Sequence, residues 1–246
     1  MAASSHLKNP PITEALLDIK AILPKDINAD TLLETYEAEK QRYPIKEVKA
    51  EWEASFQIKP GESPILSQRG GTPQGYMLRS VDKIKVFQSR LDGFTYNQLS
   101  PYDTWESFIN EGLRLWKVYS QIAKPISITR IALRFINKIE IPLPVSDLTE
   151  YINTLPSVLL SPDEKKLKYF MNVHLEDTKS KNECILTNVI EEQPNSNVVT
   201  IIIDVDAYKM TDMGMQEILP VITSLKDYKN KVFFNCISDK TKQIFQ

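Results

Sequence analysis

The chain has 246 residues, of which 42% are hydrophobic and 25% are charged, with 30 Lys and Arg against 32 Asp and Glu. This is the composition of an ordinary globular protein, and its length corresponds to about one or two domains. The net charge of −2 argues against a dedicated nucleic-acid-binding protein, because neutralising phosphates requires a surplus of basic side chains.

The cysteines and the amino-terminal residues predict a compartment. Cys184 and Cys236 are too few for a disulfide framework, and no apolar stretch approaches the ~20 residues of a membrane-spanning helix. The first residues do not join a basic segment to an apolar core, as a secretion signal does. We therefore expect a cytoplasmic protein with reduced thiols and no membrane contact. Neither C-x-x-C nor H-x-x-x-H occurs, so no zinc site is expected.

In the first half of the chain, apolar residues alternate with polar ones where strands are expected and return every three or four residues where helices are expected. Asp30 is the expected N-cap of the first helix, and Asp92-Gly93 supplies the positive φ that a hairpin turn needs. The predicted elements are a strand at 12–23, a helix at 30–43, a strand at 45–59, a loop at 60–75, two strands within 76–99 and a helix at 102–123.

The second half is expected to repeat this order. Its first strand has one apolar face and one face that mixes apolar with basic residues. The predicted elements are a strand at 126–141, a short helix capped by Ser146 or Asp147 that stops at Pro156, strands at 167–177, 184–192 and 197–206, a helix at 215–230 and a final strand at 232–237.

Both halves thus read strand, helix, three strands, helix, which predicts an α+β fold made of two similar units at 1–124 and 125–246. Antiparallel sheets with helices on one face can join edge to edge into one curved sheet. The element order resembles that of duplicated saddle-shaped domains such as the TATA-binding protein and the GyrI-like ligand-binding modules. Such a likeness concerns topology and carries no function.

Two short strings carry a family resemblance. They are Asn9-Pro10-Pro11-Ile12-x-Glu14-Ala15 and Arg134-Phe135-x-Asn137-x-Ile139-x-Ile141-Pro142. Together they resemble an uncharacterised, sporadically distributed bacterial family of similar length, and the resemblance covers essentially the whole chain. It implies a bacterial origin and no mechanism. A sporadic distribution is typical of laterally transferred accessory genes, including toxin, immunity and anti-phage defence genes.

The basic face of the strand at 126–141 is a candidate binding surface. Arg130, Arg134 and Lys138 share this face, and Arg79 and Lys83 are expected on a neighbouring strand. Aligned guanidinium groups can hold a carboxylate or a phosphate with paired hydrogen bonds, which predicts an anionic ligand or a nucleic acid. The alternative is a row of cross-strand pairs with Asp and Glu.

Asp204 and Asp206 form the candidate metal site. They end an apolar strand with both carboxylates on one face, where they could hold Mg²⁺ for phosphoryl or nucleotidyl transfer. A nucleotidyltransferase of the palm type also needs a third carboxylate and a Gly-Ser loop, and the sequence contains no Gly-Ser pair. The alternative is a solvated strand end that leads into a turn.

Other motifs fit known chemistry poorly. Glu51-Trp52-Glu53 lacks the lysine that follows in triphosphate-tunnel enzymes, and Arg69-Gly70-Gly71-Thr72 fits no phosphate loop. His174 has no nucleophile close in sequence, so a structural role is the alternative to a catalytic dyad. An aromatic ligand pocket, with core packing as the alternative, could be lined by Trp52, Trp105, Trp116, Phe94 and Tyr96.

Together these patterns favour a non-enzymatic accessory protein that binds a protein partner or an anionic ligand across the concave sheet, with no resident cofactor. The protein partner would be encoded nearby, in a defence or toxin–immunity locus. One alternative is a Mg²⁺-dependent phosphotransfer enzyme that uses Asp204 and Asp206. Another is a nucleic-acid-binding protein that uses Arg130 and Arg134.

Overall fold

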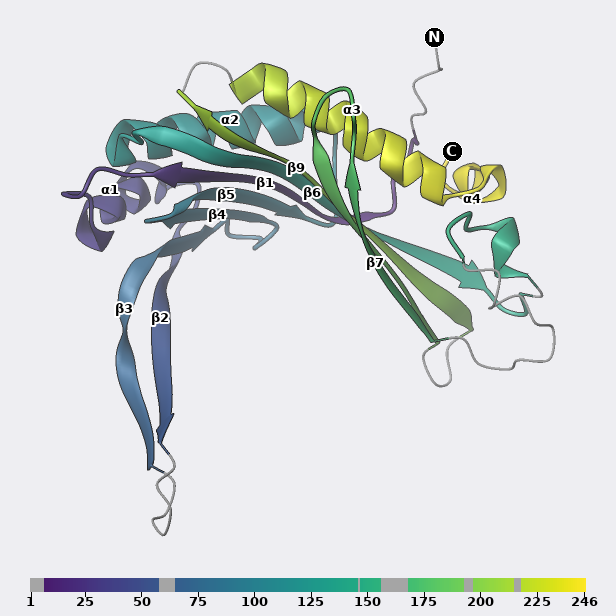
Figure 1. Cartoon of the computed structure of the whole chain (residues 1–246), viewed down its shortest axis with the longest axis horizontal. Helices are drawn as coiled ribbons and strands as arrows, with labels where there is room; N and C mark the ends of the chain where they lie inside the picture. Colours follow the sequence, from purple (N-terminus) through teal and green to yellow (C-terminus); the bar gives the residue numbers. More distant parts are fainter. Residues whose placement is uncertain (1–6, 58–64, 146, 156–167, 193–196, 215–217) are drawn as a thin grey trace.

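The computed structural model describes residues 7–57, 65–145, 147–155, 168–192, 197–214 and 218–246. These residues form one nine-stranded antiparallel sheet in the order β2-β3-β4-β5-β1-β6-β9-β8-β7, with helices packed on one face (Figure 1). The α+β class and the antiparallel sheet predicted from the sequence are thus confirmed. None of the helices in these ranges is long and apolar enough to cross a membrane.

The strands are β1 (Ile12–Ile22), β2 (Ile45–Gln57), β3 (Ile65–Arg79), β4 (Lys85–Arg90), β5 (Gly93–Leu99), β6 (Ser127–Pro142), β7 (Tyr169–Glu176), β8 (Glu183–Glu192) and β9 (Val198–Met213). The helices are α1 (Ala29–Glu39), α2 (Trp105–Ala123), α3 (Ile218–Cys236) and α4 (Asp239–Ile244), with a 3₁₀ turn, η1, at Leu148–Glu150. Long strands pair at the centre of the sheet, where β1 and β6 lie side by side in antiparallel register.

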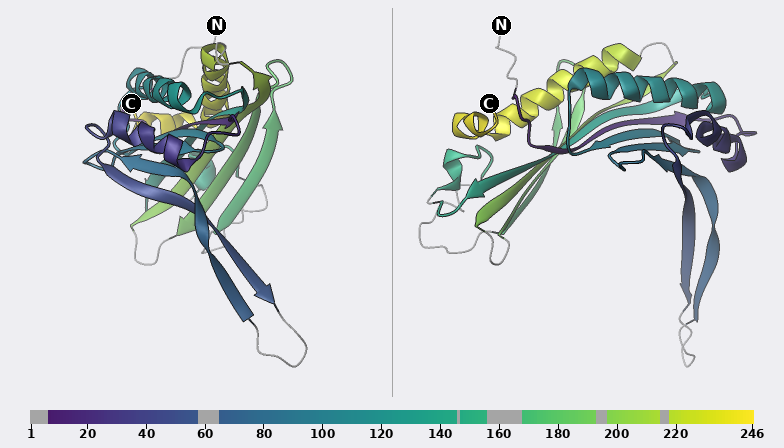
Figure 2. Two further views of the ribbon diagram at one scale, coloured as in Figure 1. Left: turned by 90° about the vertical axis from the view of Figure 1, so that its left-hand side faces the viewer. Right: turned by 180° about the vertical axis from the view of Figure 1, so that it is seen from behind.

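The alternation of residue types decides which face of the sheet the helices cover. On β1, Ala15, Leu17 and Ile19 are fully buried, whereas the residues between them, Leu16 and Asp18, are only partly buried and lie on the opposite face. Figure 2 shows α2 and α3 running along the same side of the sheet. Aromatic contacts tie α2 to the sheet, since Phe94 of β5 lies 5.7 Å from the Trp116 ring. Burying these apolar faces is the main force that holds the layers together.

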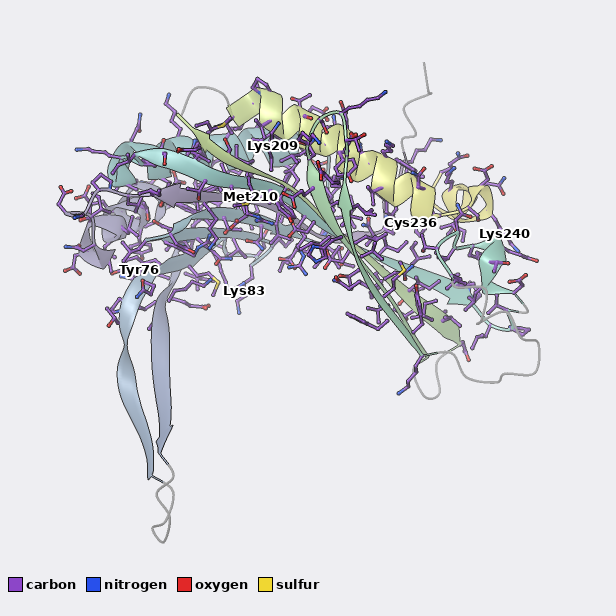
Figure 3. All side chains as sticks on the ribbon, viewed as in Figure 1. Tyr76, Lys83, Lys209, Met210, Cys236 and Lys240 are labelled. Atoms are coloured by element: carbon purple, nitrogen blue, oxygen red, sulfur yellow. The ribbon has the colours of Figure 1, made fainter. Side chains whose placement is uncertain are left out.

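Most charged residues of the central strands β1, β6 and β9, among them Asp18, Arg130 and Asp206, lie on the face that no described helix covers. The β2–β3 hairpin projects from the body on that open side (Figure 1). Tyr76 lies where the hairpin leaves the body (Figure 3), and its side chain is buried there. The hairpin lies at one end of the open face, and strands β7, β8 and β9 lie at the other end (Figure 1).

The sequence prediction of a loop at 60–75 is wrong from Ile65 onward, because this stretch forms most of β3. Its glycines and proline lie in a strand with register shifts against β2, where such residues are tolerated. Gly75 has a φ of +147°, and a Cβ there would lie 2.1 Å from the carbonyl oxygen of Ser89. Glycine is therefore required at position 75 for the close approach of β3 to β4. Because β3 is present, four strands separate α1 from α2 instead of the three predicted.

Three further sequence predictions differ from the structure. The predicted strand at 232–237 is wrong, because α3 continues to Cys236. The short helix after β6 is only a 3₁₀ turn capped by Asp147, and Ser146 lies outside the described residues. The N-cap of α1 is Asn28 and not Asp30, since the Asn28 side chain accepts a hydrogen bond from the Thr31 amide at 3.0 Å. Asn and Asp cap helices equally well, so local sequence did not separate them.

Candidate functional site

The predicted binding residues of β6 all lie on the open face and all have partners. Arg130 contacts Asp206 at 2.9 Å and Asp18 at 3.3 Å, and its guanidinium lies 4.6 Å from the centre of the Tyr208 ring. Arg134 holds Asp204 at 2.6 Å with three hydrogen bonds. Lys138 contacts Glu140 of its own strand at 2.5 Å.

The two predicted metal ligands are therefore the partners of the two predicted binding arginines. Asp204 and Asp206 of β9 accept hydrogen bonds across the β6–β9 ladder from Arg134 and Arg130. Burial raises the pKa of Asp206, against the opposing effect of Arg130. No group of three or more His, Cys, Asp or Glu side chains is placed to share a metal ion within the described ranges. The geometry is that of the cross-strand ion pairs weighed above as the alternative.

These pairs belong to a longer polar network that crosses five strands of the open face. Asp18 of β1 accepts hydrogen bonds from Arg90 of β4 at 2.9 Å and from Thr95 of β5 at 2.7 Å. Its other oxygen accepts from Arg130, which continues to Asp206 of β9. Because each cation in this network already contacts a carboxylate, its attraction for an added anion is reduced. We name this set of residues the open-face network: Arg90, Thr95, Asp18, Arg130 and Asp206.

The opposite, helix-covered face contains a pocket of about 430 Å³ between the start of α2 and the middle of α3. This volume lies within the range of small-molecule sites. The floor consists of the first residue of β1 and residues of β6 and β9, and the chain before β1 closes one side. The lining residues are Leu7, Lys8, Pro10, Ile12, Tyr102, Asp103, Thr104, Trp105, Glu106, Phe135, Asn137, Val205, Lys226, Lys229, Asn230, Phe233 and Phe234.

Two lysines of α3 supply positive charge inside this pocket. Lys229 is only 7% exposed, and its Nζ lies 3.7 Å from the centre of the Phe135 ring and 2.8 Å from Oδ1 of Asn230, to which it donates. The Nζ of the half-buried Lys226 lies 4.8 Å from the centre of the Trp105 ring. Neither lysine forms an ion pair with any carboxylate in the part of the chain that the structure describes.

Burial changes the acid–base chemistry of Lys229. Loss of hydration, with a smaller contribution from the charge of Lys226, lowers its pKa from 10.5 to about 7. The two carboxylates that line the pocket, Asp103 and Glu106, are exposed to solvent, as is Lys8. The charge that lies within the pocket is therefore positive, and an anionic group is its natural complement.

The periodicity of α3 explains why these side chains meet. Lys226, Lys229 and Phe233 recur at intervals of three and four residues, so they lie on one face of the helix. Phe135 and Asn137 are alternate residues of β6 and point to the same side of the sheet. The Asn137 amide donates to the carbonyl oxygen of Ile203 at 3.0 Å, which joins the floor across β6 and β9.

The sequence patterns did not indicate this site, although Trp105 was one of the aromatic residues predicted to line a ligand pocket. Trp105 lines the pocket, whereas Trp116, Phe94 and Tyr96 are buried in the core, and the Trp52 side chain lies outside the described residues. The available signal was two lysines on the apolar face of the predicted helix at 215–230. A buried lysine is rare unless it has a partner.

The other predicted residues are dispersed. Arg79 contacts Glu47 at 3.2 Å on the β2–β3 hairpin, and Lys83 is exposed in the turn that follows. His174 is exposed on the edge strand β7.

The two cysteines lie on different kinds of element. Cys184 and Cys236 are both buried and free, and burial raises the pKa of both thiols to about 12. Cys184 lies on a strand as predicted, but Cys236 ends α3. The backbone of Glu51, Trp52 and Glu53 is part of β2, and their side chains lie outside the described set. The backbone of Arg69–Thr72 is part of β3, where the Arg69 side chain lies outside the described set and Thr72 is exposed.

The two strings that carry the family resemblance meet beside the pocket. Pro10 and Ile12 from the first string line it together with Phe135 and Asn137 from the second. The strings are also hydrogen-bonded, since the Lys138 amide donates to the carbonyl oxygen of Pro11 at 2.8 Å. In comparisons with known proteins, neither the models of protein families nor the curated proteins contain a match to this chain, so the resemblance stays a prediction.

Proposed function

We propose that this chain is a non-enzymatic binding protein that takes an anionic small molecule with an aromatic or apolar part into the pocket between α2 and α3. One observation carries the proposal: the buried cation of Lys229 lines a pocket of aromatic walls without a carboxylate partner among the described residues. An ammonium group loses much hydration when it is buried, and a bound anion would restore the lost interaction energy.

The walls define the rest of the ligand. Tyr102, Trp105, Phe135, Phe233 and Phe234 contribute aromatic surface to one pocket. Aromatic rings bind flat apolar groups through dispersion and edge-to-face contacts. The expected ligand therefore combines a carboxylate or phosphate near Lys226 and Lys229 with a ring against these walls. This moves the anion site predicted from the sequence away from Arg130, Arg134 and Lys138, whose charges are already paired.

Binding of 1-naphthyl phosphate, measured by titration calorimetry, tests the proposal. We expect Lys226→Met and Lys229→Met each to weaken binding about tenfold or more, because each removes a charge-assisted contact of roughly 1.5–3 kcal/mol. Lys240 is the matched control, since its Nζ lies 4.4 Å from the centre of the Tyr151 ring but outside the pocket. Lys240→Met should leave the affinity unchanged. Equal affinity of all four proteins, or no binding at all, would contradict the proposal.

The affinity should also depend on pH with a defined sign. The charged form of Lys229 binds the anion, and its pKa is about 7, so affinity should fall as the pH rises from 6 to 9. The other charged or titratable groups of the pocket are Lys8, Tyr102, Asp103, Glu106 and Lys226. A phosphate becomes more negative in this pH range and would by itself strengthen binding. A sulfonate, 1-naphthalenesulfonate, is therefore the ligand for this measurement, and an affinity that rises with pH would contradict the assignment.

We also infer that the segments 1–124 and 125–246 are two related units. In support, β1 and β6 start the two segments and lie together at the centre, followed outward by β5-β4-β3-β2 on one side and by β9-β8-β7 on the other. The likeness to saddle-shaped duplicated domains, the bacterial cytoplasm as location, and an accessory role in a defence or toxin–immunity locus with a protein partner encoded nearby belong to the same proposal.

A further inference from the structure

The amine of Lys229 is placed as a nucleophile as well as a cation. It is buried beside the Phe135 ring, and a single described hydrogen bond, to Oδ1 of Asn230, fixes its direction. Lys229 is only 7% exposed, and Phe135, Phe233 and Phe234 line the same pocket. Lys226, three residues earlier on the same helix face, stays available to attract an anion. The pocket thus separates an attracting charge from a reactive amine.

We propose that Lys229 is a covalent attachment site, whose amine forms a reversible imine with an aldehyde or ketone group of the bound anion. This inference rests on the proposed function, because it names the reactive group of the ligand that the same pocket binds. It concerns capture of a carbonyl compound and requires no turnover.

The protonation state of Lys229 favours this reaction. Only the neutral amine has a lone pair that can attack a carbonyl carbon, and a lysine with a pKa near 10.5 is almost entirely protonated at neutral pH. The lowered pKa of about 7 leaves about half of the Lys229 amine neutral at pH 7. Desolvation of a lysine in an apolar pocket is a known way to activate it.

The proposed step needs no oxidant or reductant. The Nζ lone pair forms a bond to the carbonyl carbon, and a proton moves from nitrogen to the carbonyl oxygen to give a carbinolamine. This intermediate loses water, so that a carbon–nitrogen double bond replaces the carbon–oxygen double bond. Addition of water reverses the reaction.

Pyridoxal 5′-phosphate is a suitable probe, because it joins an aldehyde, an aromatic ring and a phosphate. Equimolar probe is mixed with the full chain, reduced with sodium borohydride and located by peptide mass spectrometry. We expect most of the label on Lys229, at a rate that rises with pH between 6 and 8. Lys229→Met and Lys229→Arg should lose this label, Lys226→Met should acquire it more slowly at Lys229, and Lys240→Met should behave as the parent.

A second probe separates this inference from the proposed function. Pyridoxine 5′-phosphate has the same ring and phosphate but an alcohol in place of the aldehyde, so it reports binding without imine formation. If it binds in a manner that depends on Lys226 while the aldehyde labels surface lysines and spares Lys229, the covalent inference is overturned and the proposed function stands. If neither probe binds, both are overturned. Lys229→Arg retains the cation, so loss of its label cannot be attributed to a missing charge.

Discussion

Replacing Lys229 with methionine is expected to stabilise the folded chain at pH 7 by on the order of 4 kcal/mol, because the change removes a buried charge while roughly keeping the side-chain volume. Burial lowers the pKa of Lys229 from 10.5 to about 7. Between these values the unfolded chain binds more protons than the folded chain, so the stability of the parent rises with pH across this window. The penalty is complete below about pH 7 and absent above about pH 10.5.

The difference between parent and Lys229→Met is therefore expected to be largest at or below pH 7 and to shrink as the pH approaches 10. Urea unfolding at pH 6, 7, 8.5 and 9.5, followed by circular dichroism, measures it. Lys226→Met is the comparison within the same pocket. It should change stability by only about 1 kcal/mol, since Lys226 is half-buried over Trp105. A methionine variant that is less stable than the parent at pH 7, or a difference independent of pH, would show that Lys229 carries no such penalty.

Asp18→Asn is expected to destabilise the chain by roughly 3 kcal/mol, because it leaves two half-buried guanidinium groups without the carboxylate that lies between them. Asp18 accepts from Arg90 at 2.9 Å and from Arg130 at 3.3 Å, and its side chain is 19% exposed. Both arginines retain one further acidic partner, Asp92 and Asp206 respectively. These remaining contacts place the loss at the low end for a broken buried pair.

The midpoint of urea unfolding at pH 7 measures this loss, and an exposed ion pair supplies the control. Lys181 and Glu176 lie 2.9 Å apart with side chains 67% and 54% exposed. Glu176→Gln should change stability by no more than about 0.5 kcal/mol. The double variant Asp18→Asn with Arg130→Met should lose less than the sum of the two single variants. If the free-energy changes of the two single variants were strictly additive, or if Asp18→Asn were as stable as the parent, the open-face network would contribute little to stability.

Most of the strands and the long helices could be predicted from the sequence because their signals are local. The alternation in β6 and the apolar stripe of α2 predict each element and the face that it buries. The same alternation predicted that Arg130 and Arg134 lie on one face of β6. The two-residue spacing of Asp204 and Asp206 predicted that these carboxylates lie on one face of β9. It did not show that β6 and β9 are neighbours, so two halves of one set of ion pairs were read as two separate sites.

The pocket escaped prediction because its parts come from five distant segments of the chain. Lys229 becomes part of a ligand site only because it packs over Phe135 of β6. No local sequence pattern predicts that α3 lies over β6. The β3 strand was missed for the opposite reason, since its Gly-Gly and Pro residues are locally typical of loops. Pairing with β2 along the hairpin outweighs that preference. Long-range contacts decided both cases.

The antiparallel pairing of β1 with β6 has a practical consequence for anyone who wishes to divide the protein. A cut between 124 and 125 would separate two strands that exchange backbone hydrogen bonds from Ile12 to Ile22. Each fragment would then expose a bare row of amide and carbonyl groups, which attracts other chains and promotes aggregation. Co-expressed pieces would recover solubility only by finding each other, which makes this seam a natural point for a split reporter.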